Sequence, residues 1–401
     1  MAHKTLVGGT AYEVSGGKTL VNGTAYSIKN GKTLVDGTVF VVGFGGGGKV
    51  ILEVEKITSD TYAGETTYTG EQFILLDIYP KTNGTVSVTY GGLTKTITDT
   101  SGVAEPNAQQ VFFGTFNGVS DSVSTPASGE LIIEGDVRGV SANASFNTTN
   151  KKYGYCRGVT AIVSLGNTEI LPVGAYVGCS KIQSVVIPGN VKVIESSAFS
   201  ACTALANVQI KNGVEQIRQL AFMSTDLSTI RMPASVTTMV APFVGINKDC
   251  FVEIDSGNTS YRIDGNGIVE MATNTLVEGF LNTTIPSYVT SVGLCAFYHL
   301  TGLTNLTIPA SVISIGGSAF SGCTGLTNLI IPASVISIGG SVFDSCTGLT
   351  NVTVLATTPP TLGILAFNGT TCTITVPAGC GAAYKAAENW SEYADRIVEA
   401  S

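Results

Sequence analysis

The sequence predicts a mainly β, multidomain chain that ends in a long solenoid. Three observations support this prediction. A unit of 23 residues repeats along the C-terminal three-fifths, a unit of 14 residues repeats at the N-terminus, and apolar and polar residues alternate between them. Composition agrees, because only 12% of the residues are charged and glycine contributes 48 of the 401. Short strands joined by tight turns are expected from such a composition.

Residues 1–44 are predicted to form β-hairpin repeats. Each unit begins with Lys-Thr-Leu-Val, passes through a glycine turn such as Asn22-Gly23 or Asp36-Gly37, and continues to an aromatic residue. Isolated hairpins of this size are marginal in water, so we expect the array to attach to a partner or to copies of itself. A self-sufficient meander is the alternative. The candidate attachment residues are Lys4, Tyr12, Lys18, Tyr26, Lys32 and Phe40.

A glycine linker at 45–48 is predicted to separate the hairpins from a β-sandwich at 49–148. Alternating segments such as 73–78 and 85–90 are bounded by turn dipeptides, which is typical of short strands. Several such strands favour an immunoglobulin-like architecture. The Cys…Trp…Cys pattern of true immunoglobulin domains is missing, since the one tryptophan is Trp390. A module of this kind most often serves as a spacer or display platform.

The third region, 149–401, is predicted to be the solenoid. The segments 308–330 and 331–353 are identical at 18 of 23 positions, and an Ala-Phe step recurs through the region. One coil cannot bury its apolar face alone, so stability is expected to come from stacking. The predicted repeat core consists of Phe199, Cys202, Phe222, Phe297, Phe320, Cys323, Phe343 and Cys346.

Two parts of this region depart from the period. At about 244–284 the repeat breaks, and the segment 261–267 has the pattern of a hairpin, which predicts a β-rich insertion. At about 378–401 the chain gains helical propensity and then carries Trp390, Tyr393 and Ile397. We expect a short helix here that caps the last coil.

Nine cysteines follow the repeat rather than a disulfide or metal pattern. Cys156, Cys179 and Cys202 are 23 residues apart, as are Cys323 and Cys346, which places them at equivalent positions of successive coils. Coils about 4.8 Å apart leave a disulfide within reach, but reduced thiols packed as small apolar side chains are the preferred interpretation. No CxxC or Cys/His spacing for zinc occurs. We expect no metal and no cofactor.

Charge narrows the possible partners. A net charge of −8 without a basic stripe argues against nucleic acid as a partner. No apolar run approaches the roughly 18 residues that span a bilayer, and the first residues lack the apolar core of a secretory signal. We therefore expect neither membrane insertion nor a Sec signal.

Catalytic chemistry is not indicated either. The chain has two histidines, His3 and His299, and the latter is expected at a coil edge. The segment 264–267 lacks the carboxylates of a calcium loop. Glu195, Glu215 and Asp226 fall on coils, but nothing in the sequence makes them converge. We expect a chain that is not an enzyme.

The pattern Ile-Pro-x-Ser-Val-x-x-Ile-Gly-x-x-Ala-Phe-x-x-Cys-x-x-Leu resembles the BspA-type leucine-rich repeat over about residues 153–398. The insertion near Asp264-Gly265 and the ending through Trp390 are similar to features common in that family. The resemblance implies an extracellular recognition module, as in surface adhesins of gut and oral bacteria. It brings no catalytic residues.

The 14-residue unit resembles N-terminal segments of proteins encoded by gut bacteriophages and prophages. With no export signal, this favours a non-enzymatic virion adhesion protein, a tail or head fibre or a decoration protein, assembled in the host cytoplasm. Residues 1–44 would then bind other virion proteins, and the solenoid would bind a host surface protein or glycan. The alternatives are a bacterial cell-surface adhesin, a polysaccharide-degrading tail enzyme and a purely structural component. A homo-oligomer remains open.

Overall fold

In the computed structural model the described residues form mainly β-strands and turns, with one short α-helix and one 3-10 helix among them, both near the C-terminus. The residues that the structure describes are 3–7, 10–15, 18–21, 24–27, 32–35, 38–41, 49–55, 57–58, 72–101, 109–116, 119–120, 126, 128–135, 137–141, 159–246 and 250–401. They fall into two compact units, one of 1–171, 178–191 and 203–209, the other of 172–177, 192–202 and 210–401.

Six short strands occupy the predicted hairpin units: β1 (His3–Val7), β2 (Thr10–Ser15), β3 (Lys18–Val21), β4 (Thr24–Ser27), β5 (Lys32–Val35) and β6 (Thr38–Val41). Within each unit the two strands pair antiparallel, for example with Thr5 opposite Tyr12. Their role as an attachment module stays a prediction.

The next ten strands form two sheets with antiparallel pairing. They are β7 (Val50–Glu55), β8 (Ile57–Thr58), β9 (Gln72–Pro80), β10 (Thr85–Tyr90), β11 (Leu93–Thr98), β12 (Gln109–Phe116), β13 (Val119–Ser120), β14 (Ser128–Gly135), β15 (Val137–Ser141) and β16 (Val159–Leu165). One sheet has the order β11-β10-β14-β7-β16, and the other has the order β13-β12-β9-β15, with β8 beside β9. The immunoglobulin-like type of this region stays a prediction.

Strand β16, which lies beyond the predicted boundary at 148/149, pairs antiparallel with β7, with Ile162 opposite Leu52, and so continues that sheet. Both side chains are buried in the core of that sheet. Its sequence lacks the Ile-Pro and Ala-Phe steps of the repeat, which gives the physical reason: it packs as an antiparallel strand and not as one side of a coil.

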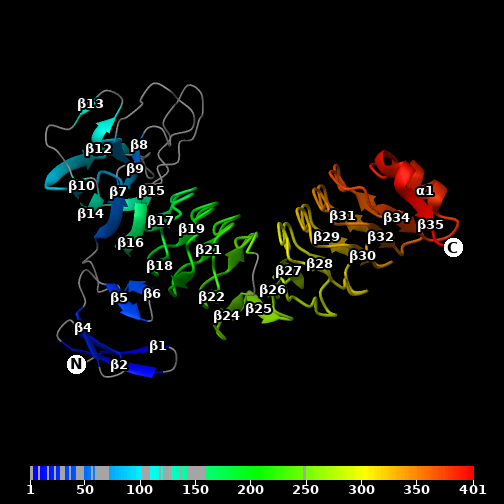
Figure 1. Cartoon of the computed structure of the whole chain (residues 1–401), viewed down its shortest axis with the longest axis horizontal. Coiled ribbons are helices and arrows are strands. Elements are labelled where there is room, and N and C mark those ends of the chain that lie inside the picture. Colours follow the sequence, from blue (N-terminus) through cyan, green and yellow to red (C-terminus); the bar gives the residue numbers. More distant parts are fainter. Residues whose placement is uncertain are drawn as a thin grey trace. The chain divides into compact units, whose positions relative to one another are not determined.

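The coils follow along the chain (Figure 1), each contributing short strands to ladders of neighbouring coils. The strands of the coils and the insertion are β17 (Ile170–Leu171), β18 (Ser184–Ile187), β19 (Val193–Ile194), β20 (Asn207–Ile210), β21 (Gln216–Ile217), β22 (Thr229–Met232), β23 (Thr238–Met239), β24 (Phe251–Ile254), β25 (Tyr261–Asp264), β26 (Gly267–Glu270), β27 (Thr275–Glu278), β28 (Ser291–Val292), β29 (Ser314–Ile315), β30 (Asn328–Ile331), β31 (Ser337–Ile338), β32 (Asn351–Val354), β33 (Thr361–Leu362), β34 (Thr373–Val376) and β35 (Ile397–Glu399). Pairing between coils is parallel, as in β19-β21-β23, β28-β29-β31-β33 and β30-β32-β34-β35.

The interruption of the coils is narrower than the predicted 244–284. β24 still pairs in parallel with β22, and β27 already pairs in parallel with β28. Between them β25 and β26 form the antiparallel hairpin that the sequence predicts, with Asp264 opposite Gly267. The strand before the hairpin and the strand after it keep the stacking of the solenoid, although their sequences no longer follow the 23-residue period.

Two stacks of aromatic rings run through the coil interior. In the first, Tyr176, Phe199, Phe222 and Phe243 have ring centroids 5.3–5.5 Å apart. In the second, Phe297, Phe320, Phe343 and Phe367 have centroids 5.1–5.6 Å apart. The backbone N–H of a stacked phenylalanine donates to a carbonyl of the following coil, as from Phe320 to Val342 at 3.0 Å. The last phenylalanine of each stack has no such carbonyl beyond it, so another group must accept its hydrogen bond.

The C-terminal cap supplies this partner for the second stack. It consists of α1 (Gly381–Ala386), the 3-10 helix Ser391–Arg396 and β35. The N–H of Phe367 donates to the hydroxyl of Tyr393 at 3.3 Å, and Trp390 Nε1 donates to the carbonyl of Pro360 at 2.7 Å. Trp390 is fully buried. The cap thus covers the last ring and satisfies backbone groups that stacking leaves unpaired.

Replacing Tyr393 with phenylalanine should lower the free energy of unfolding by about 1 kcal/mol, because the N–H of Phe367 stays buried without an acceptor. Urea unfolding of the full chain measures the change. Tyr288→Phe is the control, since its hydroxyl bonds Arg262 and Asp264 on the insertion, away from the cap. An equal loss in both variants would contradict the capping role.

Candidate recognition surface

One side of the C-terminal coils carries a regular array of neutral polar side chains. In β30, β32 and β34 alternate residues are buried, so the residues between them face outward. Parallel pairing sets equivalent positions side by side in two columns, which are Asn328, Asn351 and Thr373 in one and Ile330, Thr353 and Thr375 in the other. Twenty-three residues before β30, Asn305 and Thr307 are exposed in the same alternation.

Hydrogen bonds hold this array in place. The hydroxyl of Thr375 donates to Asn351 Oδ1 at 3.1 Å, and Asn351 Nδ2 donates to the hydroxyl of Thr353 at 3.1 Å. The hydroxyl of Thr350 donates to the backbone carbonyl of Thr327 at 2.9 Å. Neighbouring strands are about 4.8 Å apart, so the array offers donors and acceptors at a fixed spacing. We call the outward-facing, exposed or half-buried residues Asn305, Thr307, Asn328, Asn351, Thr353, Thr373 and Thr375 the Asn/Thr face.

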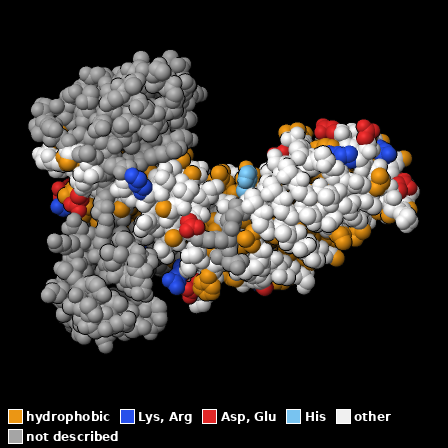
Figure 2. Space-filling view, in the orientation of Figure 1, with side chains coloured by type: hydrophobic (Ala, Val, Ile, Leu, Met, Phe, Trp, Pro, Cys, Tyr) orange, Lys and Arg blue, Asp and Glu red, His pale blue; other side chains and the backbone are white. Residues whose placement is uncertain are grey.

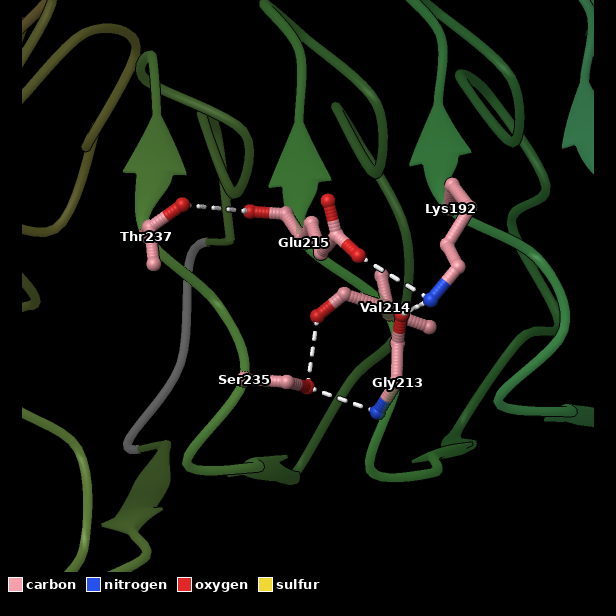
Figure 3. Close-up of polar contacts among 6 residues, drawn as sticks. All are labelled: Lys192, Gly213, Val214, Glu215, Ser235 and Thr237. Carbon is pink, nitrogen blue, oxygen red and sulfur yellow. Dashed lines mark hydrogen bonds and ion pairs between the residues drawn. The ribbon is translucent and has the colours of Figure 1, made fainter.

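Earlier coils carry charge instead. Figure 3 shows Lys192 directed toward Glu215 of the next coil, with Nζ and Oε1 3.0 Å apart and both side chains about half exposed. Lys192 Nζ also donates to the carbonyl of Gly213 at 3.2 Å. On another strand, Arg231 pairs with Glu253 at 2.9 Å. Exposed pairs like these contribute little stability, so these coils differ from the Asn/Thr face mainly in surface chemistry.

Seven of the eight described cysteines are buried thiols, and the eighth, Cys380, is partly exposed. These eight are thiols rather than disulfides, and Cys156 lies outside the described residues. The thiols of Cys202, Cys323 and Cys346 each donate to the carbonyl of an aromatic residue of the preceding coil, at 3.0, 2.9 and 2.9 Å. Burial raises the pKa of Cys346 to about 11. A thiol held protonated in this way is a poor nucleophile, so these residues act in packing.

Sequence reasoning missed one buried carboxyl group, that of Glu278 at the end of β27. Its side chain is 2% exposed, and its Oε2 accepts the N–H of Phe243 at 3.1 Å. Glu278 therefore caps the first aromatic stack as Tyr393 caps the second. Burial raises the pKa of Glu278 well above its ordinary range, and the hydrogen bond from Phe243 partly opposes that shift. Only the break in the repeat hinted at a special residue here.

The residues singled out in the sequence fall into two groups. The eight predicted core residues, Phe199, Cys202, Phe222, Phe297, Phe320, Cys323, Phe343 and Cys346, are all fully buried. The six candidate attachment residues, Lys4, Tyr12, Lys18, Tyr26, Lys32 and Phe40, lie on β1 to β6, where side chains are outside the described part of the structure.

The described carboxylates and the histidine give no sign of a reaction centre. Glu215 pairs with Lys192, Asp264 accepts a hydrogen bond from the Tyr288 hydroxyl, and His299 is exposed at a coil edge. No group of three or more His, Cys, Asp or Glu within the described ranges is placed to hold a metal ion. In the same ranges, no helix is long and apolar enough to cross a membrane.

Stacked parallel coils with a repeated Ile-Pro, Ala-Phe and Cys pattern define a leucine-rich repeat solenoid. The BspA type leucine rich repeat region matches residues 148–252 and 278–381 in six copies, slightly more than half of the chain. The chain belongs to this family. Its resemblance to the family, seen in the repeat pattern, is thereby confirmed, whereas nothing supports the resemblance of the N-terminal repeat to phage proteins.

Several solved structures are similar to this chain. A leucine-rich repeat protein from Eubacterium ventriosum is 21% identical over 54% of this chain and 66% of its own, with a TM-score of 0.45. A leucine rich cell surface protein from Faecalibacterium prausnitzii is 19% identical over 59% and 76%, with a TM-score of 0.43. The pneumococcal vaccine antigen PcpA is 16% identical over 55% and 66%, with a TM-score of 0.40. This chain thus spans just under two thirds of the first of them. Comparison with curated proteins gives no match.

Proposed function

We propose that this chain is a non-enzymatic adhesion protein of a bacterial cell surface, and that its solenoid carries the recognition surface. Membership of the BspA-type family supports this reading. The observation that carries the proposal is the Asn/Thr face, where hydroxyl and amide groups repeat in register on a rigid ladder. Fixed donors and acceptors bind a polar partner at low entropic cost, because little side-chain freedom is left to lose.

The partner that this face suits is uncharged. Hydroxyl and amide groups form hydrogen bonds in both directions, as the bonds among Thr375, Asn351 and Thr353 illustrate. The face carries no acidic or basic side chain. We therefore assign it to a neutral glycan or to a neutral stretch of a host protein.

The N-terminal parts have supporting roles in this proposal. The strands β1 to β6 would anchor the chain. The two sheets that follow would form an immunoglobulin-like sandwich and serve as a spacer between this anchor and the solenoid. A phage virion component is the second candidate, which the 14-residue repeat at the N-terminus suggests as an attachment module. Family membership favours the cell-surface reading over it.

Binding of the purified chain to immobilised neutral glycans and host matrix proteins tests the proposal. Asn328→Lys combined with Thr373→Lys places two charges on the Asn/Thr face, where both side chains are exposed. We expect binding to fall about tenfold or more, since a lysine cannot accept hydrogen bonds and must be desolvated. Surface plasmon resonance measures the loss.

The matched control is Asn207→Lys combined with Gln209→Lys, which adds the same charge to exposed positions of β20. Equal weakening by both pairs would argue against a specific face. New reducing ends after incubation with the glycans would reveal an enzyme instead. Two results would favour the virion candidate: peptides of this chain are found in purified virions, and protease treatment of intact cells releases none of them.

A further inference from the structure

Charge is distributed very unevenly along the solenoid. From Gly279 to Tyr384, about a quarter of the chain, the sequence holds a single Asp, Glu, Lys or Arg residue, Asp344. The whole chain has 50 such residues, 29 of them acidic, and a net charge of −8. In the face shown in Figure 2, the C-terminal coils are mostly white and orange, with charged side chains gathered at the cap.

The same stretch exposes most of the large apolar side chains. Seven of the ten that are exposed in the described part of the chain lie here, namely Leu294, Ile313, Ile330, Ile336, Leu355, Ile364 and Leu365. Ile313 and Ile336 are adjacent, since the N–H of Ile336 donates to the carbonyl of Ile313 at 2.9 Å. Their exposed fractions are 45% and 64%. Two neighbouring isoleucines therefore face solvent with no charged side chain beside them on the ladder.

The charged coils provide an internal comparison. The two residues compared are Glu215 in a charged coil and Ile313 in a later one. Each follows a buried valine, and the carbonyl of that valine accepts a hydrogen bond from a serine of the next coil. Ser235 donates to Val214 at 2.7 Å, as Figure 3 shows, and Ser334 donates to Val312 at 2.7 Å. The residues after these valines, Glu215 and Ile313, therefore occupy the same place in their coils.

At this place the first coils carry Lys192, Glu215 and Thr237, and the later coils carry Thr290, Ile313 and Ile336. Lys192 and Glu215 form an exposed ion pair there. Coil stacking thus tolerates charge at this position and does not require isoleucine. The fold therefore does not account for two exposed isoleucines at this place.

Two glycines follow the isoleucines in the same coils. Gly317 and Gly340 leave the backbone without side chains, and Leu294 and Ile364 extend over them from the neighbouring coils. A Cβ built on Gly317 would lie 3.5 Å from Leu294 Cδ1, and one on Gly340 would lie 3.8 Å from Ile364 Cγ1. We call Leu294, Ile313, Ile336 and Ile364, with the two glycines, the neutral strip.

We propose that the neutral strip is the contact surface between two copies of this chain. In a two-fold contact a patch meets its own copy, so a patch with charges of one sign repels itself and a neutral apolar patch does not. The remaining chain has a net negative charge and favours contact through the stretch that holds a single charged residue, Asp344. The strip flanks β28, β29, β31 and β33, whereas the paired columns of the Asn/Thr face lie on β30, β32 and β34, so pairing through the strip uses other parts of the coils.

Sedimentation velocity of the full chain, between about 1 and about 100 µM, tests this proposal. We expect concentration-dependent dimers that strengthen when sodium chloride rises from about 0.15 to about 1 M, because salt screens repulsion between the acidic parts. Ile313→Glu combined with Ile336→Glu should weaken dimerisation about tenfold or more, since each charge meets its copy across the contact. The thermal midpoint of the variant should hardly change.

Asn207→Glu combined with Thr237→Glu is the matched control, because it adds two acidic groups to exposed positions of the charged coils. It should leave dimerisation within about twofold of the wild type. If the glutamate variant folds poorly, Ile313→Thr combined with Ile336→Thr is used instead. Threonine is the residue that position 237 carries at the same place in its coil, and this variant should also weaken the dimer. A wild type that stays monomeric throughout, or a dimer that both isoleucine variants leave intact, would overturn the proposal.

Discussion

Replacing Gly316 with alanine should destabilise the solenoid by about 3 kcal/mol or more. A Cβ at this position would lie 2.7 Å from the carbonyl carbon of Gly293 and 2.7 Å from the amide nitrogen of Leu294. Both are backbone atoms of the preceding coil, to which Gly316 is tied because its N–H donates to the carbonyl of Val292 at 2.7 Å. The substitution must therefore push two coils apart, which chemical unfolding followed by circular dichroism would detect.

The neighbouring Gly317 provides the control. A Cβ there would lie 3.5 Å from its nearest neighbours, the carbonyl oxygen of Gly340 and Leu294 Cδ1, which is ordinary van der Waals contact. Gly317→Ala should change the free energy of unfolding by at most about 1 kcal/mol. The change should be an increase if alanine reduces the conformational freedom of the unfolded chain. If the two alanines cost the same, close approach of the coils is not what requires glycine at position 316.

Repetition made the coils predictable. Each copy of the 23-residue unit presents Phe and Cys at fixed intervals, and a stack is the arrangement that buries them all, as Phe320 and Cys323 illustrate. Thr-Asn pairs also recur at 304–305, 327–328 and 350–351, and they supply three residues of the Asn/Thr face. The sequence did not reveal that these pairs lie side by side and hydrogen-bond across coils, because that depends on the register of strands.

The ends of the stacks were harder to predict, because each end is unique. The cap was expected from Trp390 and Tyr393, whose large side chains suit a buried end. The carboxyl group of Glu278 was not expected, since a glutamate in a short strand is ordinarily solvated. Its role follows only from the position of Phe243, 35 residues earlier, whose N–H has lost its carbonyl partner. Local patterns do not encode a pairing over that distance.

Glu278 is the second position where we expect a large effect. Glu278→Ala should cost about 3 kcal/mol, because it leaves the N–H of Phe243 buried without an acceptor and opens a cavity beside it. Glu278→Gln keeps an acceptor oxygen and nearly the same volume, so it should cost much less at neutral pH. Chemical unfolding of both variants measures the difference. Equal losses would show that the carboxyl oxygen is not what caps the first aromatic stack.

The pH dependence of stability separates the glutamate from the glutamine. Burial holds the pKa of Glu278 well above its ordinary value of 4.5, so the folded chain keeps a proton that the unfolded chain releases. As pH rises from about 4.5 toward the folded-state pKa, the free energy of unfolding of the wild type should therefore fall relative to that of Glu278→Gln. Below about pH 4 the two curves should run parallel, because both states then hold the proton.

Glu253→Ala is the control for this measurement. Its carboxylate is exposed and paired with Arg231 at 2.9 Å, so its removal should cost at most about 1 kcal/mol and leave the fall with pH unchanged. A wild type whose stability does not fall between about pH 5 and pH 8 relative to Glu278→Gln would mean that Glu278 is ionised in the folded chain over that range. The first aromatic stack would then end on a buried negative charge rather than on a neutral acid, and the enclosure of Glu278 by the coil of Phe243 would have to be looser than the structure shows.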